Sequence, residues 1–374
     1  MTDYTLCADE LSAPTMAAGS APFRALVGGL IAVDALASAR VVVDAAEARA
    51  AADGDVVTAM ALRCARAQIG HREGRLGDAE RDVAPLLAPD RDPALTVLEP
   101  LARRTRTMLL RARGDAEGAG RTFAPLRPLV GRHPLLRGQE AALLLDAGRD
   151  AEAADAFLLA LDEDGGHGID NPAVAPWRSG AAVALARLGE RDRAVTLAAE
   201  EVALTRPLGI ARALGRALSA WGTAQGGEEG LRAHAEAVLV LERSPARISL
   251  PYALLEQGRA LRAAGQAVPA RRPLGRAGQL AEELGLAGVL AAVDAELGEA
   301  GGRARRPMRR GVASLTPAER RIATLVAEGR TSPEVATRLG IGRRTVETSL
   351  EKIFRKLDIH ARTELRDAMA ADDG

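Results

Sequence analysis

Apolar residues recur along most of the chain at the three- and four-residue spacing that is typical of amphipathic helices. Around Gly148, an apolar run at 142–145 precedes the glycine, and Ala153, Phe157 and Leu161 follow it at intervals of four. Side chains four positions apart lie on one face of a helix. The pattern therefore predicts two helices that are joined by a turn at Gly148 and pack through their apolar faces.

This hairpin pattern repeats. A glycine is followed five positions later by an alanine at Gly74/Ala79, Gly114/Ala119, Gly148/Ala153, Gly189/Ala194 and Gly265/Ala270. Successive glycines are 40, 34, 41 and 76 residues apart, with a degenerate copy near 226–227 inside the longest interval. Glycine readily takes the left-handed conformation that ends a helix, and a small alanine allows the next helix to approach closely. Because such hairpins bury their apolar faces only by stacking, we predict an all-α, tetratricopeptide-like solenoid over residues 1–297.

The composition agrees with a helical protein, because only 2% of the residues are aromatic. The most apolar stretch, 25–43, is interrupted by Asp34 and Arg40, which indicates a buried helix of a soluble protein rather than a membrane span. The two cysteines, Cys7 and Cys64, are too few for a disulfide framework or a zinc site. We therefore expect a cytoplasmic protein with no metal, no cofactor and no membrane partner.

Charge divides the chain into two parts. From residue 303 to the end there are 16 basic and 10 acidic side chains, a net charge of +6, and the rest of the chain carries −6. An acidic body with a basic end is typical of a nucleic-acid-binding tail. We interpret 298–313 as a Gly/Arg-rich linker and 314–374 as a separate module.

The C-terminal module has the signals of a small helical bundle. Thr316 with Glu319, and Pro317 at the first helical position, predicts a helix that ends near Gly329. Thr331 with Glu334 predicts a second helix up to about Leu339. Gly340-Ile341-Gly342 then forms a tight turn, and a third helix is expected from Arg343 to about Leu357.

The third helix is amphipathic. Val346, Leu350, Ile353 and Leu357 fall on one stripe that should face the other helices. In a helix-turn-helix protein the opposite face of this helix enters the major groove of DNA.

From Leu315 the sequence LTPAERRIATLVAEGRTSPEVATRLGIGRRTVETSLEKIFRKLDIHARTEL resembles the LuxR-type helix-turn-helix domain, with matches in register over some fifty residues. The resemblance implies a bacterial transcriptional regulator that binds double-stranded DNA. Residues 229–307 are similar to the segment ahead of this domain in the large ATP-binding regulators of the LuxR family. Those regulators carry a P-loop, whereas this chain has no such motif and no lysine ahead of Lys352, so we expect no ATP hydrolysis.

The resemblance also implies the residues that contact DNA. Glu347, Thr348 and Glu351 are at positions aimed at bases, and the basic residues of the third helix are better placed for phosphates. The helix ends at Thr316, Thr331 and Arg343 offer backbone N–H groups to phosphates. The predicted DNA-binding residues are Thr331, Ser332, Arg343, Arg344, Thr345, Glu347, Thr348, Glu351, Lys352, Arg355 and Lys356.

A fourth helix from Thr363 to about Ala370 is expected to carry the dimerisation surface of the family, with Leu365 and Met369 as apolar contacts. The chain is thus expected to act as a homodimer. The concave side of the helical repeats would receive a protein or a small ligand as a signal.

Two other functions are consistent with parts of the sequence. Glutamate at 347 and 351 is repelled by phosphate, so the chain could instead be an interaction scaffold whose helix-turn-helix no longer binds DNA. Paired carboxylates such as Glu200/Glu201, Glu228/Glu229 and Glu282/Glu283 lie on predicted helices, where solvated surface is the simpler interpretation. His71 and the segment 165–168 lack metal or nucleophile partners at useful spacing, so we do not expect an enzyme.

Overall fold

The computed structural model describes residues 21–164, 171–299, 315, 317–339, 346–347, 349–350, 353–354, 357, 359, 361 and 364–370. These residues form helices and connecting turns with no strand, which confirms the all-α fold class. The chain divides into two compact units, residues 1–304 and 305–374. Within the described residues, no helix is both long enough and apolar enough to span a membrane.

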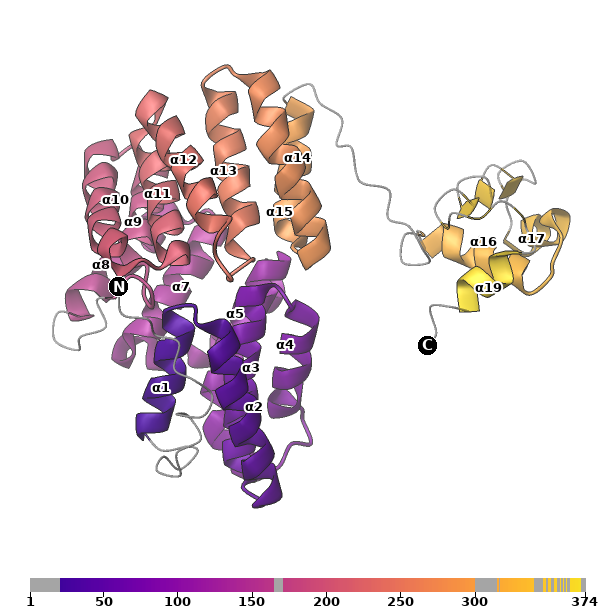
Figure 1. Ribbon diagram of the computed structural model, residues 1–374, viewed down its shortest axis with the longest axis horizontal. Coiled ribbons are helices and arrows are strands. Elements are labelled where there is room, and N and C mark those ends of the chain that lie inside the picture. Colours follow the sequence, from indigo (N-terminus) through magenta and orange to yellow (C-terminus); the bar gives the residue numbers. More distant parts are fainter. Residues whose placement is uncertain are drawn as a thin grey trace. The chain divides into compact units, whose positions relative to one another are not determined.

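The N-terminal unit is an array of helices in which each helix packs against the next (Figure 1). Its α-helices are α1 (Ala21–Ala32), α2 (Leu36–Ala52), α3 (Val56–Glu73), α4 (Leu76–Val83), α5 (Glu99–Arg113), α6 (Ala116–Phe123), α7 (Pro134–Asp146), α8 (Asp150–Asp164), α9 (Trp177–Arg187), α10 (Arg191–Thr205), α11 (Ala211–Gln225), α12 (Gly227–Leu241), α13 (Ser249–Ala263), α14 (Ala267–Leu284) and α15 (Ala287–Glu299). Short 3₁₀ segments η1 (Ala84–Leu87), η2 (Pro93–Leu98), η3 (Ala124–Arg132) and η4 (Arg206–Leu208) lie between some of them.

The glycine and alanine signals identified in the sequence mark the turns of these hairpins. All five repeat glycines have positive φ, between +70° at Gly148 and +83° at Gly189, as the end of a helix requires. The five paired alanines are buried, with at most 1% of their surface exposed. The turns therefore join α3 to α4, α5 to α6, α7 to α8, α9 to α10 and α13 to α14, as predicted.

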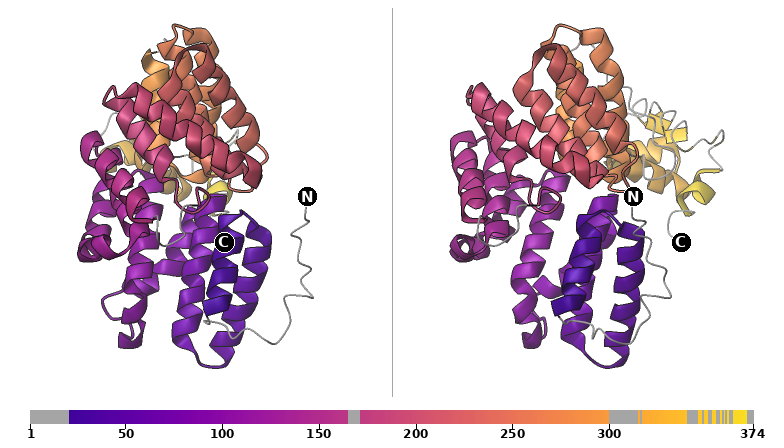
Figure 2. Two further views of the ribbon diagram at one scale, coloured as in Figure 1. Left: turned by 90° about the vertical axis from the view of Figure 1, so that its left-hand side faces the viewer. Right: turned by 60° about the vertical axis from the view of Figure 1, so that its left-hand side comes forward.

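The array is closed, because its last helices pack against helices near its beginning. One hydrophobic core contains residues of α3 to α5, such as Ala67 and Leu109, together with residues of α12 to α15, such as Leu274 and Val293. Helix α15 packs directly on α5. Figures 1 and 2 show this return, with the purple α5 next to the orange α15. The helices of this unit therefore curve around a common interior.

The prediction of one buried helix over 25–43 is wrong. The chain turns at residues 33–35 between α1 and α2, where Asp34 has φ of +60°. The carboxylate of Asp34 is buried and accepts hydrogen bonds from Arg72 at 2.9 Å and from Arg212 at 2.8 Å. A local hydrophobic pattern could not reveal this turn, because both arginines lie far away in the sequence.

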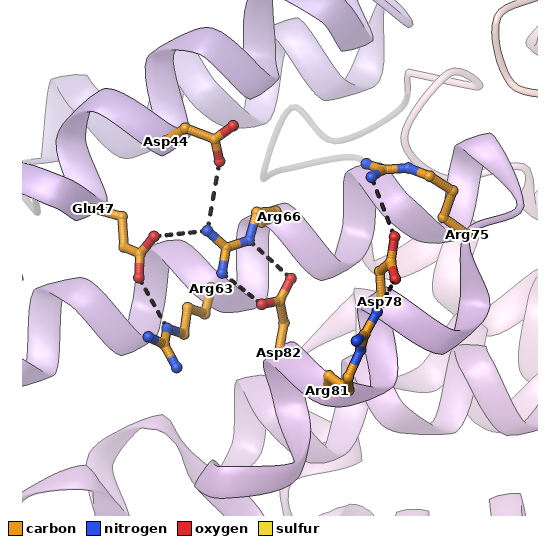
Figure 3. A network of polar contacts seen from close by, with 8 residues as sticks. All are labelled: Asp44, Glu47, Arg63, Arg66, Arg75, Asp78, Arg81 and Asp82. Atoms are coloured by element: carbon orange, nitrogen blue, oxygen red, sulfur yellow. Dashed lines mark hydrogen bonds and ion pairs between the residues drawn. The ribbon is translucent and has the colours of Figure 1, made fainter. Parts of the chain in front are cut away.

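Ion pairs join neighbouring helices at their outer faces (Figure 3). Arg66 of α3 donates to Glu47 of α2 at 2.7 Å and to Asp82 of α4 at 2.6 Å. Burial alone would raise the pKa of Glu47, but hydrogen bonds from Arg63 and Arg66 outweigh it and hold that pKa below its usual value. One guanidinium group therefore ties three consecutive helices together.

The C-terminal unit contains α16 (Pro317–Ala327), α17 (Ser332–Leu339) and α19 (Leu365–Ala370). Pro317 is the first residue of α16, as predicted, and Gly329 after the helix has φ of +88°. The predicted linker 298–313 overlaps the last residues of α15, and the rest of it lies outside the described residues. The domain limits at 297 and 314 stay predictions.

Candidate nucleic-acid interface

The predicted core stripe of the third helix is confirmed. Val346, Leu350, Ile353 and Leu357 are all buried, with between 0% and 9% of their surface exposed. They share one hydrophobic core with Ile322, Ala323 and Val326 of α16, Val335 and Ala336 of α17, and Leu315. In an α-helix, the face opposite such a buried stripe turns away from the core.

Three of the predicted DNA-binding residues belong to the described part of the chain. Thr331 and Glu347 are exposed, and Ser332 is partly buried. Glu347 directly follows the buried Val346, so it lies beside the core stripe on the outer side of the helix. The others lie outside the described residues: Arg343, Arg344, Thr345, Thr348, Glu351, Lys352, Arg355 and Lys356.

The start of α17 has the predicted contact between Thr331 and Glu334. The backbone N–H of Thr331 donates to Glu334 Oε2 at 2.7 Å, and the Thr331 hydroxyl donates to the same oxygen at 2.8 Å. Both hydrogen bonds from Thr331 lower the pKa of Glu334 below its usual value, and the one from the backbone N–H has the larger effect. This carboxylate therefore satisfies the Thr331 N–H, and phosphate contacts at this helix end would have to use other donors.

The expectation for Leu365 as a dimer contact is wrong. Leu365 is fully buried in the core of the C-terminal unit, and Met369 packs against the same core. Helix α19 contacts α16, and Arg366 Nε donates to the backbone oxygen of Ala327 at 3.2 Å. Leu365 thus helps to fold α19 onto its own unit, whereas Met369 is only partly buried and its role as a dimer contact stays a prediction.

The sequence analysis did not assign a role to three arginines of α16 and α17. Arg320, Arg321 and Arg338 line an open cleft between the two helices together with Thr324, Leu325 and Leu339. Such a group of basic side chains on one side of a helix-turn-helix can meet the phosphate backbone of DNA. The sequence signal was present in Arg320-Arg321, but only the packing of the two helices adds Arg338.

Of the carboxylate pair Glu200 and Glu201, only one side chain lies on the solvated surface that the sequence predicted. Glu200 is exposed, whereas Glu201 is fully buried and accepts hydrogen bonds from the backbone N–H of Ser179 at 2.8 Å and from its hydroxyl at 2.6 Å. Burial raises the pKa of Glu201 above its usual value. The side chain thus has a structural contact to α9 that the sequence interpretation missed.

The described helices of the C-terminal unit, their common core and the residues turned outward define a helix-turn-helix domain. Residues 313–369 match the family model of bacterial regulatory proteins of the luxR family. The C-terminal part of this chain is therefore a LuxR-family helix-turn-helix domain.

Similar proteins agree with this assignment. HTH-type transcriptional regulators of Mycobacterium bovis and Mycobacterium tuberculosis are each 42% identical over 69 residues, which cover 18% of this chain and 8% of each relative. A response regulatory protein of Escherichia coli, YgeK, is 45% identical over 51 residues, which cover 14% of this chain and 35% of that protein. The similarity thus spans a small part of these relatives.

Proposed function

We propose that this chain is a DNA-binding transcriptional regulator. The observation that carries the proposal is the match of residues 313–369 to the luxR family, in a domain whose third helix buries Val346, Leu350, Ile353 and Leu357. The outer face of the helix 343–357 enters the major groove of duplex DNA. Glu347, Thr348 and Glu351 face base edges, while Arg343, Arg344, Lys352, Arg355 and Lys356 contact phosphates.

The regulator binds as a homodimer, and the helical unit receives a protein or ligand signal. Two copies of the domain would read a two-part site, which one copy of the third helix is too short to span. Leu365 is a core residue, so the contact between copies would use the partly buried Met369 and exposed residues of α19 such as Arg366 and Asp367.

Selection of binders from a random duplex library with the full chain, followed by salt titration of the enriched sequence, tests this function. We expect a two-part motif and an affinity that falls steeply with salt, because each phosphate contact releases counterions. Lys352→Ala should weaken binding to all sequences and reduce the slope of log K against log salt by about 0.9. Arg232→Ala, at an exposed position of the helical unit, is the matched control and should change neither.

The second candidate is an interaction scaffold with a helix-turn-helix that no longer binds DNA. The exposed Glu347 on the outer side of the third helix favours it, because a carboxylate there repels phosphate. The absence of any enriched sequence, with weak binding that does not respond to salt, would support the scaffold and contradict the regulator.

A further inference from the structure

The N-terminal unit contains a half-open cavity of about 700 Å³. Its walls come from α3, α5, α7, α8, α9, α11 and α13, and from residues 174–176 ahead of α9. The cavity is therefore built by helices from both ends of the curved array. Its volume is within the range of pockets that hold drug-sized molecules.

Positive charge is concentrated on one wall of this cavity. Arg72, Arg212 and Arg216 line it, and each of them lies close enough to another for their charges to interact. The pKa of Arg72 is lowered to about 9 and that of Arg216 to about 10. Burial is the larger cause for both, and the neighbouring charge of Arg212 is the second. The single carboxylate of Asp34 pairs with both Arg72 and Arg212, so positive charge remains in excess.

Arg104 adds a further guanidinium from α5. It also lines the cavity, and burial lowers its pKa with no carboxylate among the causes. The charge of the buried Glu201 acts on Arg216, but the oxygens of Glu201 already accept two hydrogen bonds from Ser179. In the described lining of the cavity, the four arginines Arg72, Arg104, Arg212 and Arg216 thus outnumber the two buried carboxylates Asp34 and Glu201.

Several buried polar atoms of the cavity have no hydrogen-bond partner within the described part of the chain. They are Nε of Arg104, Nε of Arg216, Oγ of Ser219, Oε1 of Gln139 and Nδ1 of His71. Buried polar atoms without partners are rare in folded proteins, and five that line one cavity call for a common explanation. Three of the five, on Arg104, Arg216 and Ser219, are hydrogen-bond donors, which suits an acceptor-rich ligand group.

Apolar side chains form another part of the cavity wall. Phe157 and Trp177, which are 4% and 3% exposed, line the cavity, as do Leu135 and Ile248. An ion that is charged all over would gain nothing from these side chains, whereas an aromatic or aliphatic body would pack on them.

We propose that this cavity binds a small organic anion, whose carboxylate or phosphate meets Arg216 and Ser219 of α11 while its apolar body packs on Phe157 and Trp177. The inference that this anion is the regulatory signal rests on the proposed function. The binding site itself does not depend on DNA binding. Guanidinium groups hold carboxylates and phosphates through paired, charge-assisted hydrogen bonds, which matches the donors on this wall.

Tryptophan fluorescence of the full chain tests the proposal. The sequence contains two tryptophans, so a Trp221→Phe background leaves Trp177 in the cavity wall as the reporter. The probes are phenyl phosphate and benzoate, with inorganic phosphate for the charged group alone and benzyl alcohol for the body alone, all at constant ionic strength. We expect saturable binding of phenyl phosphate, benzoate or both, at least tenfold tighter than binding of inorganic phosphate or benzyl alcohol. The comparison of the two anions identifies the preferred charged group.

Arg216→Gln should weaken anion binding at least tenfold, and Ser219→Ala should weaken it severalfold. Arg232→Gln, in the exposed surface of α12, is the matched control and should have no effect. Circular dichroism and thermal unfolding establish that each variant is folded, and the anion should raise the melting temperature of the parent but not of Arg216→Gln. Ser219→Ala, the smallest change, keeps the test decisive if an arginine variant does not fold.

Three results would overturn the proposal: no saturation by either anion, equal binding of benzyl alcohol, or unchanged binding in the folded variants. A second measurement separates this inference from the proposed function. If the anion binds as described but the chain shows no salt-dependent DNA binding with or without it, the cavity is a ligand site and the regulator function fails. If DNA binds and no anion does, only the cavity proposal fails.

Discussion

Asp34 shows how one residue can organise distant parts of the chain. Its side chain is 5% exposed, and its φ of +60° is a conformation that aspartate and asparagine tolerate better than most residues. It accepts hydrogen bonds from Arg72 of α3 and Arg212 of α11, and Arg212 also donates to the backbone oxygens of Ala32 and Ala173. This carboxylate thus fastens the turn between α1 and α2 to the middle of the array.

Asp34→Asn should lower the free energy of unfolding by about 3–5 kcal/mol, because it leaves two buried guanidinium groups without their carboxylate. Asparagine keeps the size and tolerates the positive φ, so the change isolates the charge. Urea unfolding of the full chain measures the effect. Asp53→Asn, at an exposed position after α2, is the control and should change stability by less than about 0.5 kcal/mol. A loss below 1 kcal/mol for Asp34→Asn would show that the ion pairs do not stabilise this turn.

At the scale of helices, the contacts of α3 combine packing with charge. Its inner face contributes Cys64 and Ala67 to the main core, while Arg66 connects it to α2 and α4 on the outside (Figure 3). The side chains of Arg66, Glu47 and Asp82 are 25%, 15% and 15% exposed. These ion pairs are therefore less screened by solvent than most surface pairs, and they should contribute to stability.

Arg66→Met should lower the free energy of unfolding by about 1–3 kcal/mol at neutral pH, because Asp82 loses its ion pair with Arg66 and Glu47 keeps the hydrogen bond from Arg63 but loses the one from Arg66. Arg81→Met, whose side chain is 80% exposed, is the control and should cost less than about 0.5 kcal/mol.

The effect of Arg66→Met should also depend on pH. The folded-state pKa of Glu47 is lowered, so its contribution is complete above the unfolded-state pKa of about 4.3 and is lost as the pH falls further. Unfolding measured from pH 7 to pH 3 should therefore show the difference between parent and variant shrinking below about pH 4. A difference that stays constant would contradict this account of Glu47.

For the whole N-terminal unit, the return of α15 to α5 decides whether the array is open or closed. The contact between these helices occurs at Gly114 and Gly288, where the backbones come so close that an added Cβ on Gly288 would lie 3.0 Å from Gly114 Cα. Gly114 also has φ of +78° because it ends α5. This close approach therefore depends on two residues without side chains, Gly114 directly after α5 and Gly288 in α15.

Gly288→Ala should lower the free energy of unfolding by about 1–3 kcal/mol, because the new methyl group forces α15 away from α5. Gly298→Ala in the same helix is a matched control: its Cβ would meet nothing within 4 Å, and alanine favours helix more than glycine does. Urea unfolding of the two variants compares the effects. Equal stability of both variants would mean that the contact between α5 and α15 does not hold the unit closed.

The sequence by itself determined the elements and the C-terminal domain. The left-handed glycines at Gly74 and Gly148, the buried alanines after them, and the stripe from Val346 to Leu357 followed from local rules, because helix ends and helix faces depend on residues a few positions apart. The family resemblance of residues 313–369 was predictable for the same reason, since its motif is contiguous.

Only the tertiary structure decided which distant residues meet. The turn at Asp34, the burial of Glu201 and Leu365, and the cavity lined by Arg104 and Arg216 all depend on pairings across several helices. A periodic sequence shows that a helix has an apolar face but not which helix covers it. An arginine at the same spacing can therefore lie in solvent or line a cavity, and the fold determines which.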